Sequence, residues 1–138
     1  MEELRIPEIV NRSEFMADWQ KSFRFALEGL WQTARTQRNF RIQLAMGTVA
    51  IGMGLGFPLS RLEWGVLVLT IMIVLSGELF NTALEALVDL VSPEFRTLAK
   101  TAKDCAAGAV LVSAFGAVAI GLLLFGPRLW ALFLGHGR

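Results

Sequence analysis

Several residue types are scarce in this chain of 138 residues. Its one cysteine, Cys105, cannot form a disulfide within the chain, and we expect it to be a buried packing thiol. Its one histidine, His136, lies in a glycine-rich tail and is not expected to bind a metal. Basic and acidic residues nearly balance, at 13 and 12, and both signs mix near the N-terminus, so nothing indicates a nucleic-acid partner.

Charge is also absent from three long stretches. No charged residue occurs at positions 42–60, 64–77 or 105–127. An uncharged run of about 18 residues can span the hydrocarbon core of a bilayer. The first and third runs are long enough, and the second is shorter but continues into a semi-polar helical stretch. A soluble helical bundle is the alternative, but a domain of this size would not segregate its charges in this way. We therefore expect an all-α membrane protein, organised as one domain over residues 1–138.

Three transmembrane helices are predicted, at 40–57, 62–91 and 98–126. Pro58 follows the first, Pro93 the second and Pro127 the third. At a rise of 1.5 Å per residue the second helix is about 45 Å long, more than the ~30 Å hydrocarbon core. Its last turns should therefore emerge from the membrane.

Residues 13–36 show the periodicity of an amphipathic helix, with Ser13 as a candidate N-cap. At helical spacing the apolar residues form one face, and polar residues such as Lys21, Arg24 and Glu28 form the other. Beside transmembrane segments, such a helix usually lies flat on the membrane surface. Packing of its apolar face on the other helices is the alternative, and both can hold.

Basic residues set the expected orientation. They concentrate on the side that carries residues 1–41 and 92–104. Cytoplasmic loops of membrane proteins carry an excess of lysine and arginine. We therefore expect a multi-pass protein with a cytoplasmic N-terminus and the C-terminus on the other side.

Four polar residues share one face of the second predicted transmembrane helix. Their spacing of i, i+3, i+7 and i+11 keeps them on a single stripe, and they are Glu78, Asn81, Glu85 and Asp89. Carboxylates in a membrane segment are costly and mark a functional site by default. A structural polar network within a bundle is the alternative reading.

The loop after this stripe adds charges of both signs, from Glu94, Arg96, Lys100, Lys103 and Asp104. Acidic groups beside basic ones at a membrane edge suit a polyanion and a divalent cation, because Mg²⁺ takes one or two carboxylates plus substrate phosphates. Phosphoryl transfer needs mainly positioning and charge neutralisation. Glu78, the deepest carboxylate, is the candidate general base. The chain has no P-loop and no protein-kinase glycine loop, and Gly52-x-Gly54-x-Gly56 lacks the strand that a dinucleotide fingerprint needs.

The stripe and the loop closely resemble the signature of bacterial diacylglycerol and undecaprenol kinases. The matching segments are residues 78–89, 98–111 and 38–42, and the resemblance extends from about residue 15 to 124. It implies a homotrimeric lipid kinase of the bacterial plasma membrane, with ATP as co-substrate, Mg²⁺ as cofactor and a lipid alcohol as acceptor. By position it implies that Glu78 is the general base and Asn81 its supporting amide. It further implies that Glu85 holds the metal of MgATP, and that Glu94, Lys103 and Asp104 contact the nucleotide.

The chain departs from this family at three positions. The family's second metal-binding glutamate corresponds here to Gln37, whose amide supplies no negative charge. Glu28 is nine residues away and on the opposite helical face, so it cannot easily replace it. In the amphipathic helix, Asp18 and Phe25 stand where the family has basic and tyrosine positions. We expect weaker or different handling of one metal ion.

The sequence is therefore compatible with two functions. The first is a lipid kinase, with undecaprenol and diacylglycerol as competing acceptors. The second is a non-catalytic membrane protein that uses the carboxylate stripe for ion passage or assembly. The stretch 99–108 looks more like the undecaprenol kinases.

Overall fold

The computed structural model describes residues 12–94 and 96–135, which form four α-helices and no strand. The helices are α1 (Arg12–Thr36), α2 (Arg38–Gly56), α3 (Arg61–Val91) and α4 (Thr97–Gly135). The chain divides into two compact units, the first ending at Gln32 and the second beginning at Thr33. His136 lies outside the described residues.

In the first unit, α1 exposes its large apolar side chains. Trp19, Phe23 and Trp31 are each at least 60% exposed. On its polar face, Lys21 pairs with Asp18 and Arg24 pairs with Glu28. The helix begins at Arg12, so Ser13 lies inside it.

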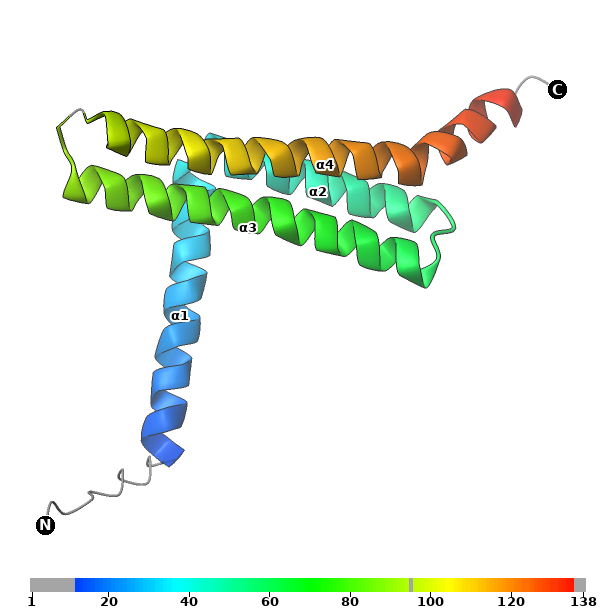
Figure 1. The fold of residues 1–138 in the computed structure, drawn as a ribbon. Helices are drawn as coiled ribbons and strands as arrows, with labels where there is room; N and C mark the ends of the chain where they lie inside the picture. Colours follow the sequence, from blue (N-terminus) through cyan, green and yellow to red (C-terminus); the bar gives the residue numbers. More distant parts are fainter. Residues whose placement is uncertain (1–11, 95, 136–138) are drawn as a thin grey trace, which may run out of the picture. The chain divides into compact units, whose positions relative to one another are not determined.

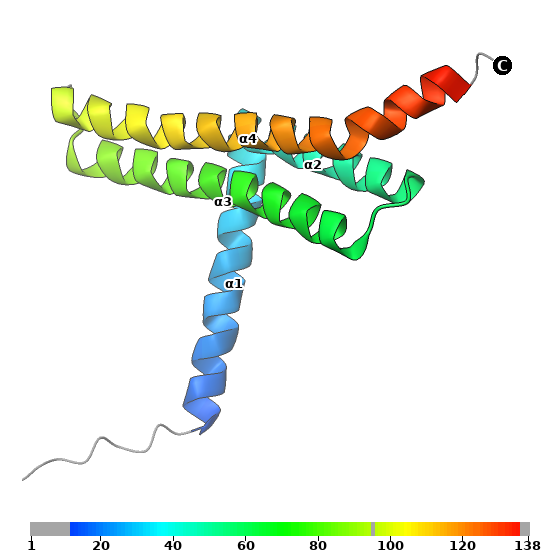
Figure 2. The same cartoon turned by 45° about the vertical axis from the view of Figure 1, so that its right-hand side comes forward.

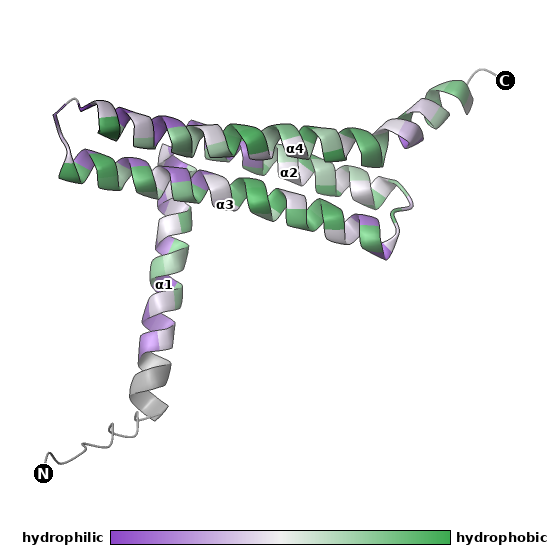
Figure 3. Cartoon of the chain, viewed as in Figure 1, coloured by the Kyte–Doolittle hydropathy of each residue, from purple (hydrophilic) through white to green (hydrophobic). Residues whose placement is uncertain are grey.

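In the second unit, α3 packs against both α2 and α4 (Figure 1). The view in Figure 2 agrees: α4 returns alongside α3 in the opposite direction. Figure 3 shows hydrophobic residues along the middle of α3 and α4, and more hydrophilic residues where α4 begins. The α3–α4 loop therefore marks the polar end of the bundle, and the α2–α3 turn marks the other end.

The α2–α3 turn is fixed by a capping box. Ser60 is the N-cap of α3; its Oγ accepts from the Glu63 amide at 3.3 Å, and Glu63 Oε2 accepts from the Ser60 amide at 2.8 Å. This reciprocal pair satisfies amides that a helix start leaves open. Glu63 Oε1 also receives a bond of 2.8 Å from Arg128 Nη2, which ties the turn to α4.

The hydrophobic core lies at this same end of the bundle. Leu67, Leu124 and Phe125 are buried, and the partly buried residues around them come from α2, α3 and α4. The rings of Phe57 and Phe125 lie 6.1 Å apart, centroid to centroid. Buried apolar contacts thus hold the three helices together far from the polar loop.

Two glycines let α2 approach α3 closely. A Cβ built on Gly54 would lie 2.9 Å from the Trp64 ring, and one on Gly47 would lie 3.1 Å from Ile71. Both glycines are buried. Small residues at a helix interface allow such close packing.

Two helices are long and apolar enough to cross a membrane: α3 along its whole length and α4 from Thr97 to Leu134. Only 17% and 11% of their most apolar windows are buried, whereas the core helix of a soluble protein is mostly buried. The helix expected at 40–57 is present as α2, but Arg38 and Arg41 reduce its apolar character, and it is not among the two. The third span therefore stays a prediction, as does the organisation as one domain.

Two sequence-based expectations are wrong. The helix predicted to end at 126 continues through Pro127 to Gly135. Proline removes one backbone hydrogen bond, here to the carbonyl of Leu123, and bends a helix without always ending it. Cys105 is exposed rather than buried.

Candidate active site

Three residues of the predicted stripe lie together on α3. Asn81 Nδ2 donates a hydrogen bond of 2.9 Å to Glu85 Oε1, one turn further along. Glu78 lies about two turns before Glu85 on the same face of the helix. The i, i+3, i+7 spacing that the sequence predicted is therefore realised as one cluster on one face.

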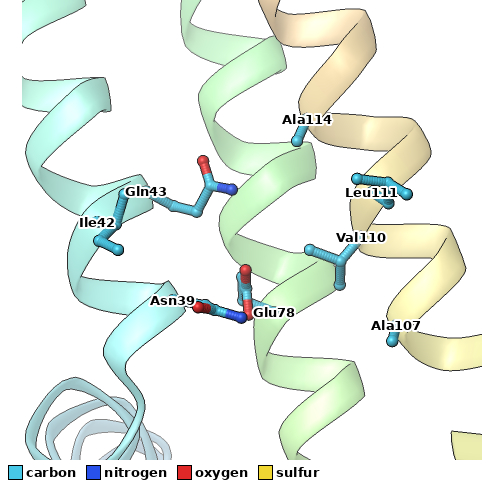
Figure 4. A pocket seen from close by; sticks show the side chains of 8 residues that line it. All are labelled: Asn39, Ile42, Gln43, Glu78, Ala107, Val110, Leu111 and Ala114. Carbon is cyan, nitrogen blue, oxygen red and sulfur yellow. The ribbon is translucent and has the colours of Figure 1, made fainter. Parts of the chain in front are cut away.

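Glu78 is the buried charge of this cluster, with only 3% of the residue exposed. Its carboxylate accepts no hydrogen bond from the residues that the structure describes, and it faces a pocket of about 200 Å³ (Figure 4). The pocket is lined by all three helices of the bundle: Asn39, Ile42, Gln43, Glu78, Ala107, Val110, Leu111 and Ala114. No lysine or arginine lines it, so the carboxylate meets mostly apolar and amide groups.

Sequence reasoning missed the two amides on α2. Asn39 and Gln43 are four residues apart, so they share a helical face, and both line the pocket with Glu78. Asn39 lies in residues 38–42, one of the segments that resemble the kinase family, and Gln43 interrupts an apolar run. An amide in such a run is a signal for a polar partner elsewhere. What the sequence could not give was the packing of α2 against α3.

One of the two polar atoms of the Asn81 side chain has no hydrogen-bond partner among the described residues. Its Oδ1 is buried and makes no hydrogen bond within the part of the chain that the structure describes. Asn81 also lines a largely apolar groove of about 500 Å³ between α3 and α4, formed with Gly77, Phe80, Ala83, Leu84, Leu87, Ala106 and Ala109. A buried amide oxygen without a donor is uncommon in folded proteins and calls for a ligand, an ion or water.

Lys103 joins α4 to the polar end of α3. Its Nζ lies 2.9 and 3.1 Å from the two carboxylate oxygens of Asp89, and it also interacts electrostatically with Glu85. Of Glu94, Lys103 and Asp104, Lys103 is thus the one that contacts a carboxylate of the predicted stripe, that of Asp89.

The other two predicted contacts lie apart from this cluster. The Glu94 side chain makes no hydrogen bond or ion pair with the described residues; only its backbone carbonyl accepts, from Ser92 at 3.4 Å. Asp104 pairs with Lys100 one turn before it on α4. Both carboxylates are exposed at the polar end of the bundle.

The cluster could hold a metal ion only if other ligands complete the coordination shell. The described residues contain no group of three histidine, cysteine, aspartate or glutamate side chains that could hold a metal alone. Mg²⁺ commonly takes one or two carboxylates and completes its shell with phosphates and water. The Glu85 carboxylate suits that role, and the Asn81 amide orients it.

Gln37 occupies the N-cap of α2, between α1 and α2. It is half-buried, and its side chain makes no capping hydrogen bond. The amide is therefore available to a ligand, although it brings no charge. Glu28 and Asp18 are exposed and pair with neighbours on α1.

Comparison with known proteins places this arrangement in a family. A family model described as prokaryotic diacylglycerol kinase matches residues 24–125. The chain is 47% identical to the undecaprenol kinase of Bacillus subtilis over 79% of this chain and 89% of that protein. It is 46% identical to the diacylglycerol kinase of Synechocystis sp., over 82% of this chain and 65% of that protein. It is 40% identical to a diacylglycerol kinase of Helicobacter pylori, over 83% of this chain and 86% of that protein.

The matched region contains α2, α3, nearly all of the apolar part of α4 before Pro127, and every residue of the cluster. It covers well over half of the chain, and the relatives are named as kinases. The chain therefore belongs to the prokaryotic diacylglycerol kinase family and is a lipid kinase.

Proposed function

We propose that this lipid kinase transfers the γ-phosphoryl group of ATP, bound as its Mg²⁺ complex, to the hydroxyl group of diacylglycerol or undecaprenol. The observation that carries the proposal is the burial of Glu78 in a pocket between α2, α3 and α4. A carboxylate in that position has no cation to neutralise it among the residues lining the pocket. It is therefore free to take a proton from an alcohol that enters from the membrane.

The pocket suits the acceptor alcohol. Ile42, Val110 and Leu111 provide apolar walls for the start of a hydrocarbon chain, and two alanines of α4 leave room for it. Asn39 and Gln43 supply amide groups that can hold the hydroxyl near Glu78. The hydroxyl oxygen attacks the γ-phosphorus, Glu78 accepts the hydroxyl proton, and the bond from that phosphorus to the bridging oxygen of ADP breaks.

The nucleotide would lie on the loop side of Glu78. Glu85, oriented by Asn81, would hold Mg²⁺, which neutralises charge on the phosphates when it is bound. Lys103 would exchange Asp89 for a phosphate oxygen, and the exposed carboxylates of Glu94 and Asp104 would contact the rest of the nucleotide. Lysine is a common phosphate ligand because its ammonium is a compact point charge.

We propose three transmembrane helices, α2, α3 and α4, with α1 on the membrane surface. The exposed tryptophans and phenylalanines of α1 support this assignment, since an amphipathic helix buries such residues at the headgroup boundary. The arginines and lysines near the α3–α4 loop favour a cytoplasmic position for that end and for the N-terminus. The membrane would be the bacterial plasma membrane.

A homotrimer is proposed from the resemblance to the family. The apolar groove beside Asn81 supports self-association, because a second copy could cover it. Mass measurement of the protein in lipid nanodiscs tests the number of copies: three are expected, and a monomer would overturn this part.

The acceptor is not decided by overall similarity. The relatives named undecaprenol kinase and diacylglycerol kinase are 47% and 46% identical to this chain. Family membership favours a kinase over the non-catalytic ion pathway, which no observation supports separately. Both lipid alcohols therefore enter the test.

The test incubates the purified protein in lipid with γ-labelled ATP, Mg²⁺ and each alcohol in turn. Transfer of label to at least one lipid is expected, and no transfer to either would contradict the proposal. Ala114→Leu narrows the pocket and should raise KM for the lipid without raising KM for ATP. Ala119→Leu places the same bulk at an exposed position of α4 and is the matched control.

A further inference from the structure

The last turns of α4 are unusual for a transmembrane helix. With 39 residues and a rise of 1.5 Å per residue, α4 is about 58 Å long, far more than the ~30 Å of a hydrocarbon core. Figures 1 and 2 show its axis changing direction towards the C-terminal end. Pro127 lies within the helix there and accounts for the bend. The part after the bend therefore points away from the axis of the span.

This terminal segment, residues 129–135, is apolar on every side. It contains no charged residue and no polar side chain. Trp130 is 68% exposed, Phe133 79% and Leu134 63%. Ordinary amphipathic surface helices keep a polar face toward water, and this segment has none. Water is thus an unfavourable environment for it on every side.

The one charge at the bend is turned inward. Arg128 Nη2 lies 2.8 Å from Glu63 Oε1 and 3.3 Å from the Pro58 carbonyl, and Nη1 bonds to the Leu124 carbonyl. These bonds place the guanidinium against the α2–α3 turn. The charge is neutralised there, so it does not hold the residues that follow in water.

We propose that residues 129–135 bind the membrane itself, as a short apolar foot in the leaflet opposite the α3–α4 loop. Its occupant is lipid, because the segment continues directly from a helix that is apolar enough to cross the bilayer. Trp130 lies just after the bend, and tryptophan favours the boundary between headgroups and acyl chains. Arg128, paired with Glu63, lies at the level of the turn, and the foot leaves the bundle there at an angle to the span (Figures 1 and 2).

Spin-label accessibility tests this proposal without using kinase activity. Cys105 is the only cysteine, so Cys105→Ala provides a background for single labels in the full chain. A label at Phe133→Cys is compared with one at Arg61→Cys, an exposed position on the α2–α3 turn at the same end of the bundle. Both proteins are placed in phosphatidylcholine vesicles, and collision rates are measured with oxygen and with a water-soluble nickel complex.

The expected result is an oxygen-to-nickel ratio several-fold higher at position 133 than at position 61. Equal ratios would place the foot in water and overturn the proposal. Low collision rates with both reagents, with broadening between labels, would place it against a second copy and also overturn it. If Phe133→Cys does not give a folded protein, Leu134→Cys carries the same test.

Discussion

Asn81 donates a hydrogen bond of 2.9 Å from its Nδ2 to Glu85 Oε1 and leaves its Oδ1 buried without a donor. The amide therefore orients the carboxylate proposed to hold the metal. Partners of this kind, which orient a metal ligand, typically change affinity or activity by about 10–100-fold when they are lost.

Asn81→Leu should therefore reduce kcat/KM for MgATP by about 10–100-fold. KM for the lipid should change little, because Asn81 does not line the pocket of Glu78. Thr82→Val is the matched control. It removes the Thr82 hydroxyl, which lies on the same helix and bonds only to the Glu78 backbone carbonyl. An equal loss in both variants would contradict a specific role for the amide.

Loss of the Lys103 ammonium group should lower activity but leave stability almost unchanged. Its pair with Asp89 is largely exposed, and such pairs contribute about 0–1 kcal/mol. Lys103→Met should thus leave the unfolding midpoint almost unchanged. It should lower kcat/KM for MgATP by about 100-fold or more, the usual effect of losing a group that stabilises developing charge.

Lys100→Met is the control for Lys103, because Lys100 also pairs with an aspartate, Asp104, at the same end of α4. Its loss should affect kcat/KM much less. If the two variants have the same activity, Lys103 is not a nucleotide ligand.

A substitution at Gln37 tests the effect of the negative charge that this position lacks. Gln37→Glu restores a carboxylate at the N-cap of α2, where the family resemblance expects a metal ligand. The Mg²⁺ concentration needed for half-maximal rate should fall, because a carboxylate binds the cation more strongly than an amide. A magnesium titration at fixed ATP measures it, and an unchanged curve would count against the role of this position.

Alanine substitutions at Gly54 and Gly52 distinguish the effect of helix packing from that of helix propensity. A Cβ at Gly54 would meet the Trp64 ring at 2.9 Å and Leu59 at 3.1 Å, whereas one at Gly52 meets nothing within 4 Å. Gly54→Ala should lower the free energy of unfolding by about 1–3 kcal/mol through overpacking. Gly52→Ala should be neutral, or raise it by about 0.5–1 kcal/mol through helix propensity. Unfolding in mixed micelles measures both changes in free energy. A change of the same sign in the two variants would contradict the close packing at Gly54.

The sequence predicted the helical elements well, because proline and uncharged runs mark their limits. The helix expected at 62–91 occurs at Arg61–Val91. The exception was α4, because a proline often ends a helix but can also bend one that stays continuous, as Pro127 does here. The residue pattern alone does not distinguish these two outcomes.

The candidate site was predicted only along one helix. Helical periodicity suffices to place Glu78, Asn81 and Glu85 on one face, since all three share α3. Asn39 and Gln43 required knowledge of how α2 packs against α3, and that packing is set by close contacts at glycines. Pairing between Lys103 and Asp89 likewise depends on the register of α4 against α3.

In the proposed reaction, the buried Glu78 carboxylate accepts the proton of the lipid hydroxyl during phosphoryl transfer. The kcat of Glu78→Gln tests this role, because the substitution keeps the shape of the side chain and removes its basicity. We expect a fall of about 10²–10⁴-fold with an unchanged elution profile, while Glu28→Gln, at an exposed glutamate of α1, retains wild-type activity. A folded Glu78→Gln protein that transfers phosphate at the wild-type rate would contradict it.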